Sequence, residues 1–323
     1  MEAPLVSVLL PVYNGVPYLG EAIESILRQT YQRFELIIVN DGSTDDSAAI
    51  IASFDDQRIK YFEQENLGLT ATLNRAITLS SGGYIARQDA DDVSFPERLA
   101  KQVAFLERHP DHGMVGSWSE IWEGSRRTKR AHQHPCDNIA LKFHLLFGCY
   151  FVHTSVMLRS SVLQRVGLYA TERSRQPEDY ELWSRILRSG CCKVANLPEK
   201  LVAYREVPDS ICRSDFTLKD GVVNICRENL AMASRRGPDE QVVNDLAALA
   251  HYAFHRLSHP PRMMAVSSLI GEVYSWAVGD EPGQVSLLKE LWREQARIWR
   301  AYLSYRLRPL AAKLGLLPSG KAS

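Results

Sequence analysis

The sequence predicts an α/β fold: a mainly parallel sheet with helices on both faces, followed by a helical C-terminal region. Two observations carry this prediction. Strand-like and helix-like patterns alternate from the N-terminus to about residue 120, and this alternation is typical of parallel sheets whose connections are helices. From about residue 216 onward the patterns are helical, with breaks at 237–238, 260–261 and 282–283.

The first 120 residues contain five strand candidates and four helix candidates. Apolar, β-branched runs predict strands over residues 6–12, 35–39, 59–63, 84–88 and 114–118. Helical spacing of apolar residues predicts helices over 19–27, from about 46, over 69–79, and from 96 to about 108. The segment 121–215 is less regular. There we expect a short helix within 134–147, a helix over 179–188, and strands over 151–158, 193–197 and 201–204.

Composition excludes several classes of protein. Lys plus Arg and Asp plus Glu each number 38, so no overall basic charge indicates a nucleic-acid partner. The six cysteines form no C-x-x-C pair, which is typical of free thiols in a reducing cytosol, although the even count leaves disulfides open. The apolar run near the N-terminus is short and follows no basic region, and no stretch approaches the roughly 20 apolar residues that span a bilayer. We therefore expect a cytoplasmic protein.

Polar loops follow three of the predicted strands. They begin at Tyr13, Asn40 and Asp89. In parallel α/β sheets, ligands bind beyond the carboxyl ends of the strands. The three loops should therefore converge on one rim that holds the ligand.

The strongest single signal is the run Asp89-Ala90-Asp91-Asp92. Three carboxylates in four residues repel one another unless a cation neutralises them, and Mg²⁺ binds through one or two carboxylates plus substrate phosphates. A solvated acidic turn, with Asp92 capping the next helix, accounts for the same residues. The run alone leaves both interpretations open.

The second signal is Asp41, in the run 39–45. Gly42 permits a tight turn, so Asp41 would project at the rim, where it could accept a hydrogen bond from a base or a ribose hydroxyl. A helix-capping turn is the better interpretation for residues 43–45 and an equal alternative for Asp41. Tyr13 could stack on a nucleotide base or be an ordinary loop aromatic.

Taken in order, these motifs resemble those of the family 2 glycosyltransferases, which have the GT-A fold, a Rossmann-like α/β sheet. The matching stretches are residues 6–15, 38–45, 66–68, 87–92 and 176–183. The resemblance covers about residues 5–210. It implies a catalytic domain over 1–215, with a nucleotide-binding half (1–120) and an acceptor-side half (121–215), and a C-terminal helical region over 216–323.

The resemblance also implies a role for each matched position in the donor site. Pro11, Tyr13 and Asp41 are expected to line the nucleoside pocket. Asp89 and Asp91 match the D-x-D motif that holds the donor diphosphate through Mg²⁺ or Mn²⁺, so Asp89 counts as both a nucleotide-binding and a metal residue. The donor implied is a nucleotide-sugar, most often a UDP-sugar, with guanosine and thymidine donors as alternatives.

Two acidic residues and two pocket residues complete the expected site. Asp179 matches the catalytic base, with Glu178 beside it as a second candidate. His153 and Arg87 lie in stretches that place them in the pocket, although a structural histidine is the commoner case. The base and the leaving group must lie on opposite faces of the anomeric carbon, so the metal site and Asp179 should come from different segments.

The reaction implied is transfer of a sugar to an acceptor hydroxyl with inversion, in cell-surface glycan biosynthesis. The acceptor would be a glycan or a lipid-linked glycan. The Q-x-x-R-W pattern of processive synthases is absent after Asp179, so we expect a single addition. One alternative, a sugar-1-phosphate nucleotidylyltransferase, would need a glycine-rich loop where this chain has only Gly15. The other, a catalytically silent scaffold, should have lost one of the acidic residues.

Residues 288–308 suggest a separate hypothesis. We expect a helix that ends at Pro309, with an apolar face opposite a basic one. The apolar face is formed by Leu288, Leu291, Trp292, Ile298, Trp299, Tyr302 and Leu303. Such a helix could dock on the inner face of a membrane. Packing on the protein, with its arginines in water, is the slightly favoured alternative.

Overall fold

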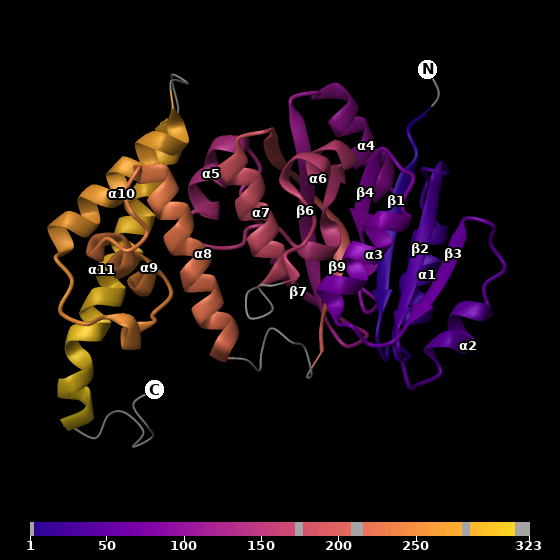
Figure 1. Ribbon diagram of the computed structural model, residues 1–323, viewed down its shortest axis with the longest axis horizontal. Coiled ribbons are helices and arrows are strands. Elements are labelled where there is room, and N and C mark those ends of the chain that lie inside the picture. The colour runs from indigo at the N-terminus through magenta and orange to yellow at the C-terminus, as the bar shows by residue number, and fades with distance from the viewer. Residues whose placement is uncertain (1–2, 172–176, 208–215, 280–284, 314–323) are drawn as a thin grey trace. The chain divides into compact units, whose positions relative to one another are not determined.

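The structure is a computed structural model that describes residues 3–171, 177–207, 216–279 and 285–313 (Figure 1). The chain forms two compact units. The sheet unit comprises residues 1–141, 150–174 and 181–214, and the helical unit comprises 142–149, 175–180 and 215–323.

One sheet runs through the sheet unit. Its strands within the described residues follow the order β3-β2-β1-β4-β8-β6-β9-β5, and β7 pairs with β6 outside that path. The strands are β1 (Val6–Val12), β2 (Phe34–Asp41), β3 (Ile59–Gln64), β4 (Tyr84–Arg87), β5 (Val93–Ser94), β6 (His112–Glu123), β7 (Arg126–His132), β8 (Met157–Arg159) and β9 (Lys193–Glu206).

The first four strands of this order are parallel, as the sequence predicts. Every residue of β1 and β2 is buried, which is typical of parallel strands covered on both faces. The helices that accompany them are α1 (Leu19–Leu27), α2 (Ser47–Ala52), α3 (Leu69–Leu79) and α4 (Arg98–Arg108). The predicted bounds of β1 and α3 are confirmed.

The rest of the sheet is mixed, since β6 and β9 are parallel while β8, β7 and β5 pair in antiparallel fashion. The strand predicted over 151–158 was wrong: a 3-10 helix, η1 (His153–Ser155), precedes the short β8. The Ser155 hydroxyl and the Ser155 N–H both donate to the Val152 carbonyl, and these local bonds replace an extended conformation.

Further corrections concern β9 and β7. The two strands predicted over 193–197 and 201–204 are one continuous strand, β9, because it pairs with β6 along its length across register shifts. The prediction missed β7, whose seven residues include four exposed basic ones. Charged side chains are typical of an edge strand, where they hide the hydrophobic alternation. It also missed α6 (Ser160–Val166).

The helical unit contains the long C-terminal helices. They are α8 (Phe216–Ser234), α9 (Gln241–Ala250), α10 (Met263–Val278) and α11 (Val285–Lys313). The breaks expected at 237–238 and 260–261 fall between helices, and the break at 282–283 lies outside the described residues. The expected helix end at Pro309 was wrong, since α11 continues to Lys313. Proline removes one backbone hydrogen bond, and near the exposed end of a helix water can satisfy the carbonyl that is left free.

Two helices include residues of both units, namely α5 (Asn138–Leu145) and α7 (Glu178–Ser189). No helix among the described residues combines the length and the apolar character needed to cross a membrane. The five cysteines that the structure describes are free thiols.

Candidate active site

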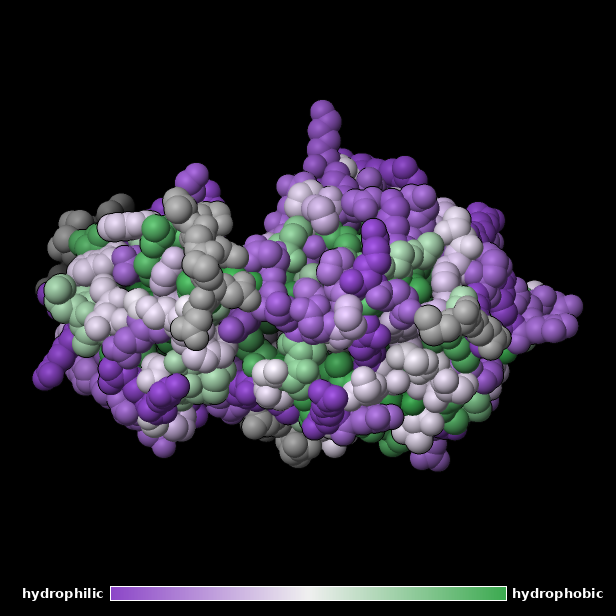
Figure 2. Space-filling view, turned by 90° about the horizontal axis from the view of Figure 1, so that it is seen from above, coloured by the Kyte–Doolittle hydropathy of each residue, from purple (hydrophilic) through white to green (hydrophobic). Residues whose placement is uncertain are grey.

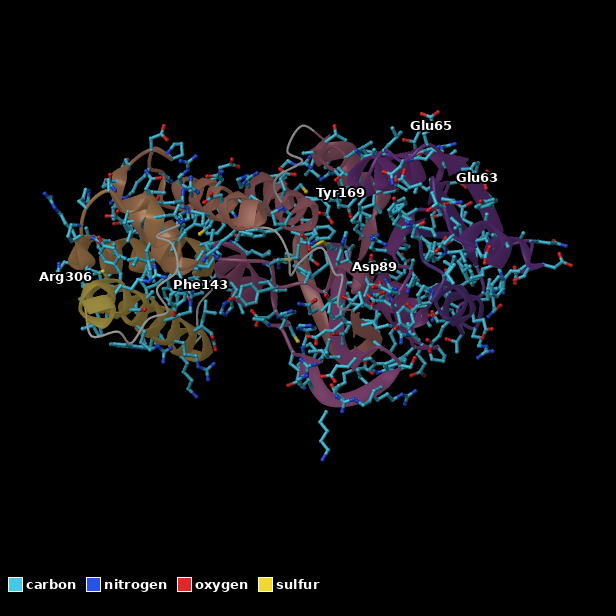
Figure 3. The ribbon with its side chains drawn as sticks, turned by 90° about the horizontal axis from the view of Figure 1, so that it is seen from below. Glu63, Glu65, Asp89, Phe143, Tyr169 and Arg306 are labelled. Carbon is cyan, nitrogen blue, oxygen red and sulfur yellow. The ribbon has the colours of Figure 1, made fainter. Side chains whose placement is uncertain are left out.

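Loops from β1, β2 and β4 meet at the carboxyl ends of these strands, the side seen in Figure 3. Asn14 joins the first two loops, since its N–H donates to Ser43 Oγ (3.0 Å) and its Oδ1 accepts from the Thr44 N–H (2.9 Å). The acidic turn lies against the same place, because a Cβ built on Gly15 would be 3.5 Å from the Cβ of Ala90. The predicted convergence on one rim is confirmed.

Tyr13 and Pro11 differ in exposure. Tyr13 is 55% exposed, which leaves its ring accessible at the rim. Pro11 is buried in β1, opposite Val39 of β2, so it belongs to the floor of the rim and not to its surface. Residues 43–45 serve the loop itself, as Asp45 accepts bonds from the Val16 N–H and the Ser47 N–H.

Asp41 ends β2 and is almost completely buried. Its Oδ1 accepts from the Leu67 N–H (2.9 Å) and from Gln64 Nε2 (2.6 Å), and its Oδ2 accepts from the Gly68 N–H (2.9 Å). The carboxylate therefore fixes the loop before α3, a role that the capping-turn interpretation did not foresee. A carboxylate has about four acceptor directions, so about one remains for a ligand.

Gly42 makes this arrangement possible. Its φ is +71°, and a Cβ at this position would lie 2.8 Å from the Asn66 backbone nitrogen. Any side chain would be strained and would push the 66–68 loop away from Asp41.

Buried side chains hold the acidic turn from within. Gln88 Nε2 donates to the carbonyls of Asp89 (3.0 Å) and Asp92 (2.8 Å). The Arg205 backbone N–H donates to Asp92 Oδ1 (2.7 Å), and its Nε donates to the Asp91 carbonyl (2.6 Å). Thr154 Oγ1 accepts from the Asp89 N–H (3.1 Å). The turn is therefore a preorganised element.

The Asp92 side chain is buried within the turn and accepts a hydrogen bond from the Arg205 backbone N–H. Burial and the charge of Asp89 raise its pKa. Asp89 pairs with the buried Arg87 (2.5 Å). The side-chain carboxylate of Asp91 accepts a hydrogen bond from no other described residue, and burial, together with the charge of Asp89, raises its pKa to about 6. The Asp91 carboxylate thus has no ion-pair partner of its own within the described chain.

This donor set fits a divalent cation. Asp89 and Asp91 supply hard oxygen ligands, and a cation would relieve their repulsion. Across the part of the chain that the structure describes, no three His, Cys, Asp or Glu side chains converge as a complete cage. Mg²⁺ commonly binds in such a way, through one or two carboxylates with substrate phosphates completing its coordination.

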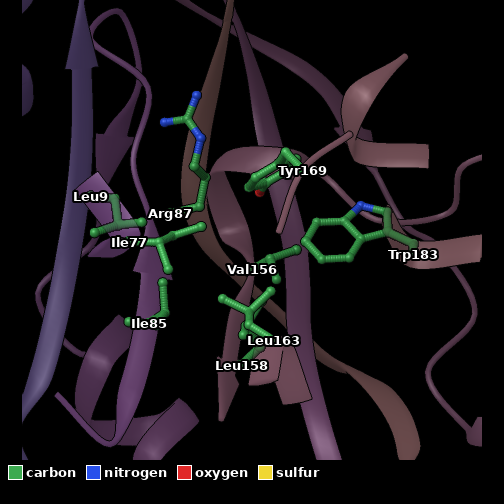
Figure 4. Close-up of a pocket in the computed structure, with 9 residues that line it drawn as sticks. All are labelled: Leu9, Ile77, Ile85, Arg87, Val156, Leu158, Leu163, Tyr169 and Trp183. Carbon is green, nitrogen blue, oxygen red and sulfur yellow. The ribbon is translucent and has the colours of Figure 1, made fainter. Parts of the chain in front are cut away.

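His153 and Arg87 lie beside the turn, where Arg87 is buried and His153 is partly buried. His153 Nε2 is 3.0 Å from the Tyr169 hydroxyl, and its ring packs edge-on against Trp183. Arg87, Tyr169 and Trp183 line a cavity of about 10 Å³, room for about one water (Figure 4). Of these residues, Arg87 reaches the acidic turn through its ion pair with Asp89, whereas His153, Tyr169 and Trp183 pack against one another. Sequence reasoning did not distinguish this role from ligand contact.

A larger hollow of about 510 Å³ lies elsewhere, beside Gly82 and Ser160. Gly82 precedes β4, so this hollow is at the amino-terminal ends of the strands, the side seen in Figure 2. It is separate from the rim that carries the acidic turn.

Glu178 and Asp179 begin α7 and are grouped with the helical unit. Asp179 Oδ1 accepts from the Tyr180 N–H (2.6 Å), and its Oδ2 lies 3.6 Å from Cys149 Sγ. Both base candidates therefore come from a different segment of the chain than Asp89 and Asp91, which follow β4.

Comparison with known proteins agrees with this architecture. The model of glycosyl transferase family 2 matches residues 7–167. The "Putative glycosyltransferase EpsE" of Bacillus subtilis (strain 168) is 39% identical over 223 residues, which cover 67% of this chain and 78% of that protein. An uncharacterized glycosyltransferase of Haemophilus influenzae is 33% identical over 266 residues, covering 78% of this chain and 81% of that protein.

Two solved structures share the fold. S. aureus TarS 1–349 in complex with UDP-GlcNAc has a TM-score of 0.60 at 17% identity, covering 96% of this chain and 92% of that one. The mannosyltransferase PcManGT from Pyrobaculum calidifontis, in complex with GDP-Man and Mn²⁺, has a TM-score of 0.56 at 19% identity, covering 94% and 88%.

The sheet and these likenesses define a GT-A-like glycosyltransferase fold. The chain belongs to glycosyl transferase family 2, and this membership supports glycosyl transfer as its activity.

Proposed function

We propose that this protein transfers a single sugar from a nucleoside-diphosphate sugar to an acceptor hydroxyl, with inversion and with a divalent cation. The observation that carries the proposal is the acidic turn at the end of β4. Its backbone is held by Gln88 and Arg205, while the Asp91 carboxylate remains without a partner of its own among the described residues. We propose that the catalytic chemistry is confined to residues 1–215.

The donor is proposed to be a UDP-sugar that binds over the ends of β1 and β2. Tyr13 is accessible for stacking, Pro11 forms the floor, and Asp41 keeps one acceptor direction for the base or ribose. Solved structures of the same fold contain UDP-GlcNAc, UDP or GDP-Man, which are all nucleoside diphosphates or their sugars. This common chemistry supports the donor class.

Asp89 and Asp91 are proposed to hold Mn²⁺ or Mg²⁺ together with the donor diphosphate. When bound, the cation stabilises the charge that develops on the leaving diphosphate. Arg87 stays paired with Asp89 and orients that carboxylate.

Asp179 is proposed to take the proton from the acceptor hydroxyl, since a hydroxyl is a poor nucleophile until a base removes its proton. Glu178 is the second candidate. In-line displacement then converts an α-linked donor into a β-linked product. The acceptor is proposed to be a glycan or a lipid-linked glycan of the cell surface, reached from the inner face of the membrane.

Donor hydrolysis followed by NMR tests the mechanism without a known acceptor. With UDP-sugars and Mn²⁺, the first-formed free sugar should be the β anomer. Asp179→Asn should slow hydrolysis by about 10²-fold or more while UDP binding remains. Asp55→Asn, at an exposed position of the sheet unit, is the control and should behave like the wild type.

Each outcome has a clear meaning. An α anomer appearing first would contradict inversion. Unchanged hydrolysis in Asp179→Asn, with loss in Glu178→Gln, would move the base to the neighbouring carboxylate. Loss in neither variant would refute a base at the start of α7.

A further inference from the structure

Helix α11 carries two apolar stripes, and one of them is exposed. Seven residues between Leu288 and Leu303 were expected to share one broad apolar face, but the structure divides them. Of these seven Ile298 is buried, and so are Leu287 and Ala301, which the prediction left outside that face. The exposed members are Leu288 (43%), Trp292 (68%), Trp299 (39%), Leu303 (53%) and Leu307 (56%).

The buried stripe is already used for packing. Ile298 is fully buried in the helical unit, Arg297 donates to the Ala250 carbonyl of α9, and the Tyr305 ring packs against Phe254. The helix is therefore anchored without the exposed stripe. Because the apolar arc is wide, one side of it packs while the other side remains in water.

The exposed stripe follows helical periodicity. Its residues are separated by four, seven, four and four positions, which places them on one face at about 100° per residue. Two of the five are tryptophans, the residue that prefers a boundary between apolar and aqueous phases. An exposed apolar patch that is continuous along a helix marks an interaction site.

Basic residues run beside this stripe. Lys289, Arg293 and Arg300 each follow a stripe residue directly, and Arg306 lies within the stripe's own face. Arg293 pairs with Glu290, whereas Lys289, Arg300 and Arg306 form no ion pair with any residue the structure describes. Figure 3 labels Arg306 on α11. The exposed face is therefore apolar and net positive.

We propose that this face of α11 docks the protein on an anionic lipid surface. The tryptophans and leucines would enter the region between headgroups and acyl chains, and the three unpaired cations would contact the anionic headgroups. Charge complementarity favours lipid over a second copy of the chain, because two copies joined through this stripe would bring their cationic rows together.

Vesicle sedimentation of the full chain tests the proposal. The protein should pellet with phosphatidylcholine vesicles that contain phosphatidylglycerol and not with phosphatidylcholine alone, and added salt should weaken binding. Replacing both exposed tryptophans (W292S/W299S) should abolish pelleting. Neutralising the cations (K289Q/R300Q/R306Q) should weaken it on the order of 100-fold, at about fivefold per charge. All five of the replaced residues are exposed on α11, so the variants should still fold.

Two kinds of control show whether pelleting depends on this face of α11. Met264→Ser removes an 82%-exposed apolar side chain from α10 and should leave pelleting unchanged. The tryptophan variant should still bind UDP, and Asp91→Ala should still pellet, so failure of membrane docking and failure of the proposed transferase function are distinguishable. Equal binding to neutral and anionic vesicles, no binding to either, or dimerisation that depends on Trp292 would overturn the proposal.

Discussion

Arg205 offers a sharp test of how the acidic turn is built, through the variant Arg205→Met. Arg205 is about 2% exposed, and its guanidinium makes three polar contacts in addition to the bond that its backbone N–H donates to Asp92. Nε donates to the Asp91 carbonyl (2.6 Å), one terminal nitrogen donates to the Gly124 carbonyl (2.5 Å), and the other pairs with Glu21 (2.6 Å).

Arg205→Met is destabilising because methionine can replace none of the polar contacts of the guanidinium. Met keeps the apolar volume but leaves two carbonyls without donors, at about 1 kcal/mol each, the low end for partly buried acceptors. Loss of the cation 4.1 Å above the Tyr18 ring adds about 1 kcal/mol. Glu21 is half-exposed and can be hydrated, so its ion pair adds little. The total loss of unfolding free energy should be about 3 kcal/mol.

Urea unfolding followed by tryptophan fluorescence measures this loss. The matched control is Arg130→Met, which breaks exposed pairs with Glu123 and Glu206 and should cost about 0–1 kcal/mol. Arg205→Met should also weaken Mn²⁺-dependent UDP binding, because the Asp91 backbone loses its support. A loss no larger than that of Arg130→Met, with binding unchanged, would refute the proposed role of Arg205.

Three further predictions concern single positions. Gly42→Ala should lower the free energy of unfolding by about 1–2 kcal/mol, because the new Cβ would lie 2.8 Å from the Asn66 nitrogen. The control Gly271→Ala, in α10, has open space for its Cβ and should stabilise the protein by up to about 1 kcal/mol. Thermal melts that rank the two variants in the opposite order would contradict this prediction. Asp41→Asn should lower the free energy of unfolding by about 1–3 kcal/mol and raise the Kd for UDP, because an amide presents only one oxygen to the three donors that surround Asp41. Calorimetry that shows wild-type affinity for UDP would exclude Asp41 from the nucleoside pocket. Burial, with the charges of Arg297 and Lys219, lowers the pKa of His251 to about 4. As the pH falls from 6.5 to 5 the unfolded chain binds this proton and the folded chain does not, so the free energy of unfolding should fall by about 2 kcal/mol. The urea midpoint of His251→Gln should therefore fall less steeply with decreasing pH than that of the wild type, and equal pH dependence of the two midpoints would contradict this prediction.

Continuous apolar runs gave the most accurate predictions from sequence. β1 and α3 have the predicted bounds because burial on one or both faces imposes the pattern directly. The strand predicted over 151–158 fails because hydrogen bonds local to Ser155 compete with extension, and β7 is missed because its exposed basic residues conceal the alternation. Sequence patterns report burial well and local hydrogen-bond competition poorly.

The site shows the same division. The three rim loops could be located because each follows a buried strand. Arg205 and Thr154 could not be found, because each acts on the acidic turn from a distant part of the chain, 114 residues away for the Arg205–Asp91 bond. No local pattern marks such a contact. In α11 the predicted apolar face did not include Leu287, Ala301 or Leu307, and only packing shows that Ile298 is buried while Trp292 is exposed.

The central claim is that the acidic turn binds a nucleoside diphosphate through a divalent cation. Calorimetric titration of the full chain with UDP, GDP and dTDP, in Mn²⁺ and again in EDTA, tests it most directly. We predict saturable binding of one nucleotide in Mn²⁺, strongest for UDP, that is lost in EDTA and in Asp91→Ala but retained in Asp55→Asn. Equal binding with and without the metal, or no binding of any nucleotide by the folded wild-type protein, would contradict the claim and favour a catalytically silent scaffold.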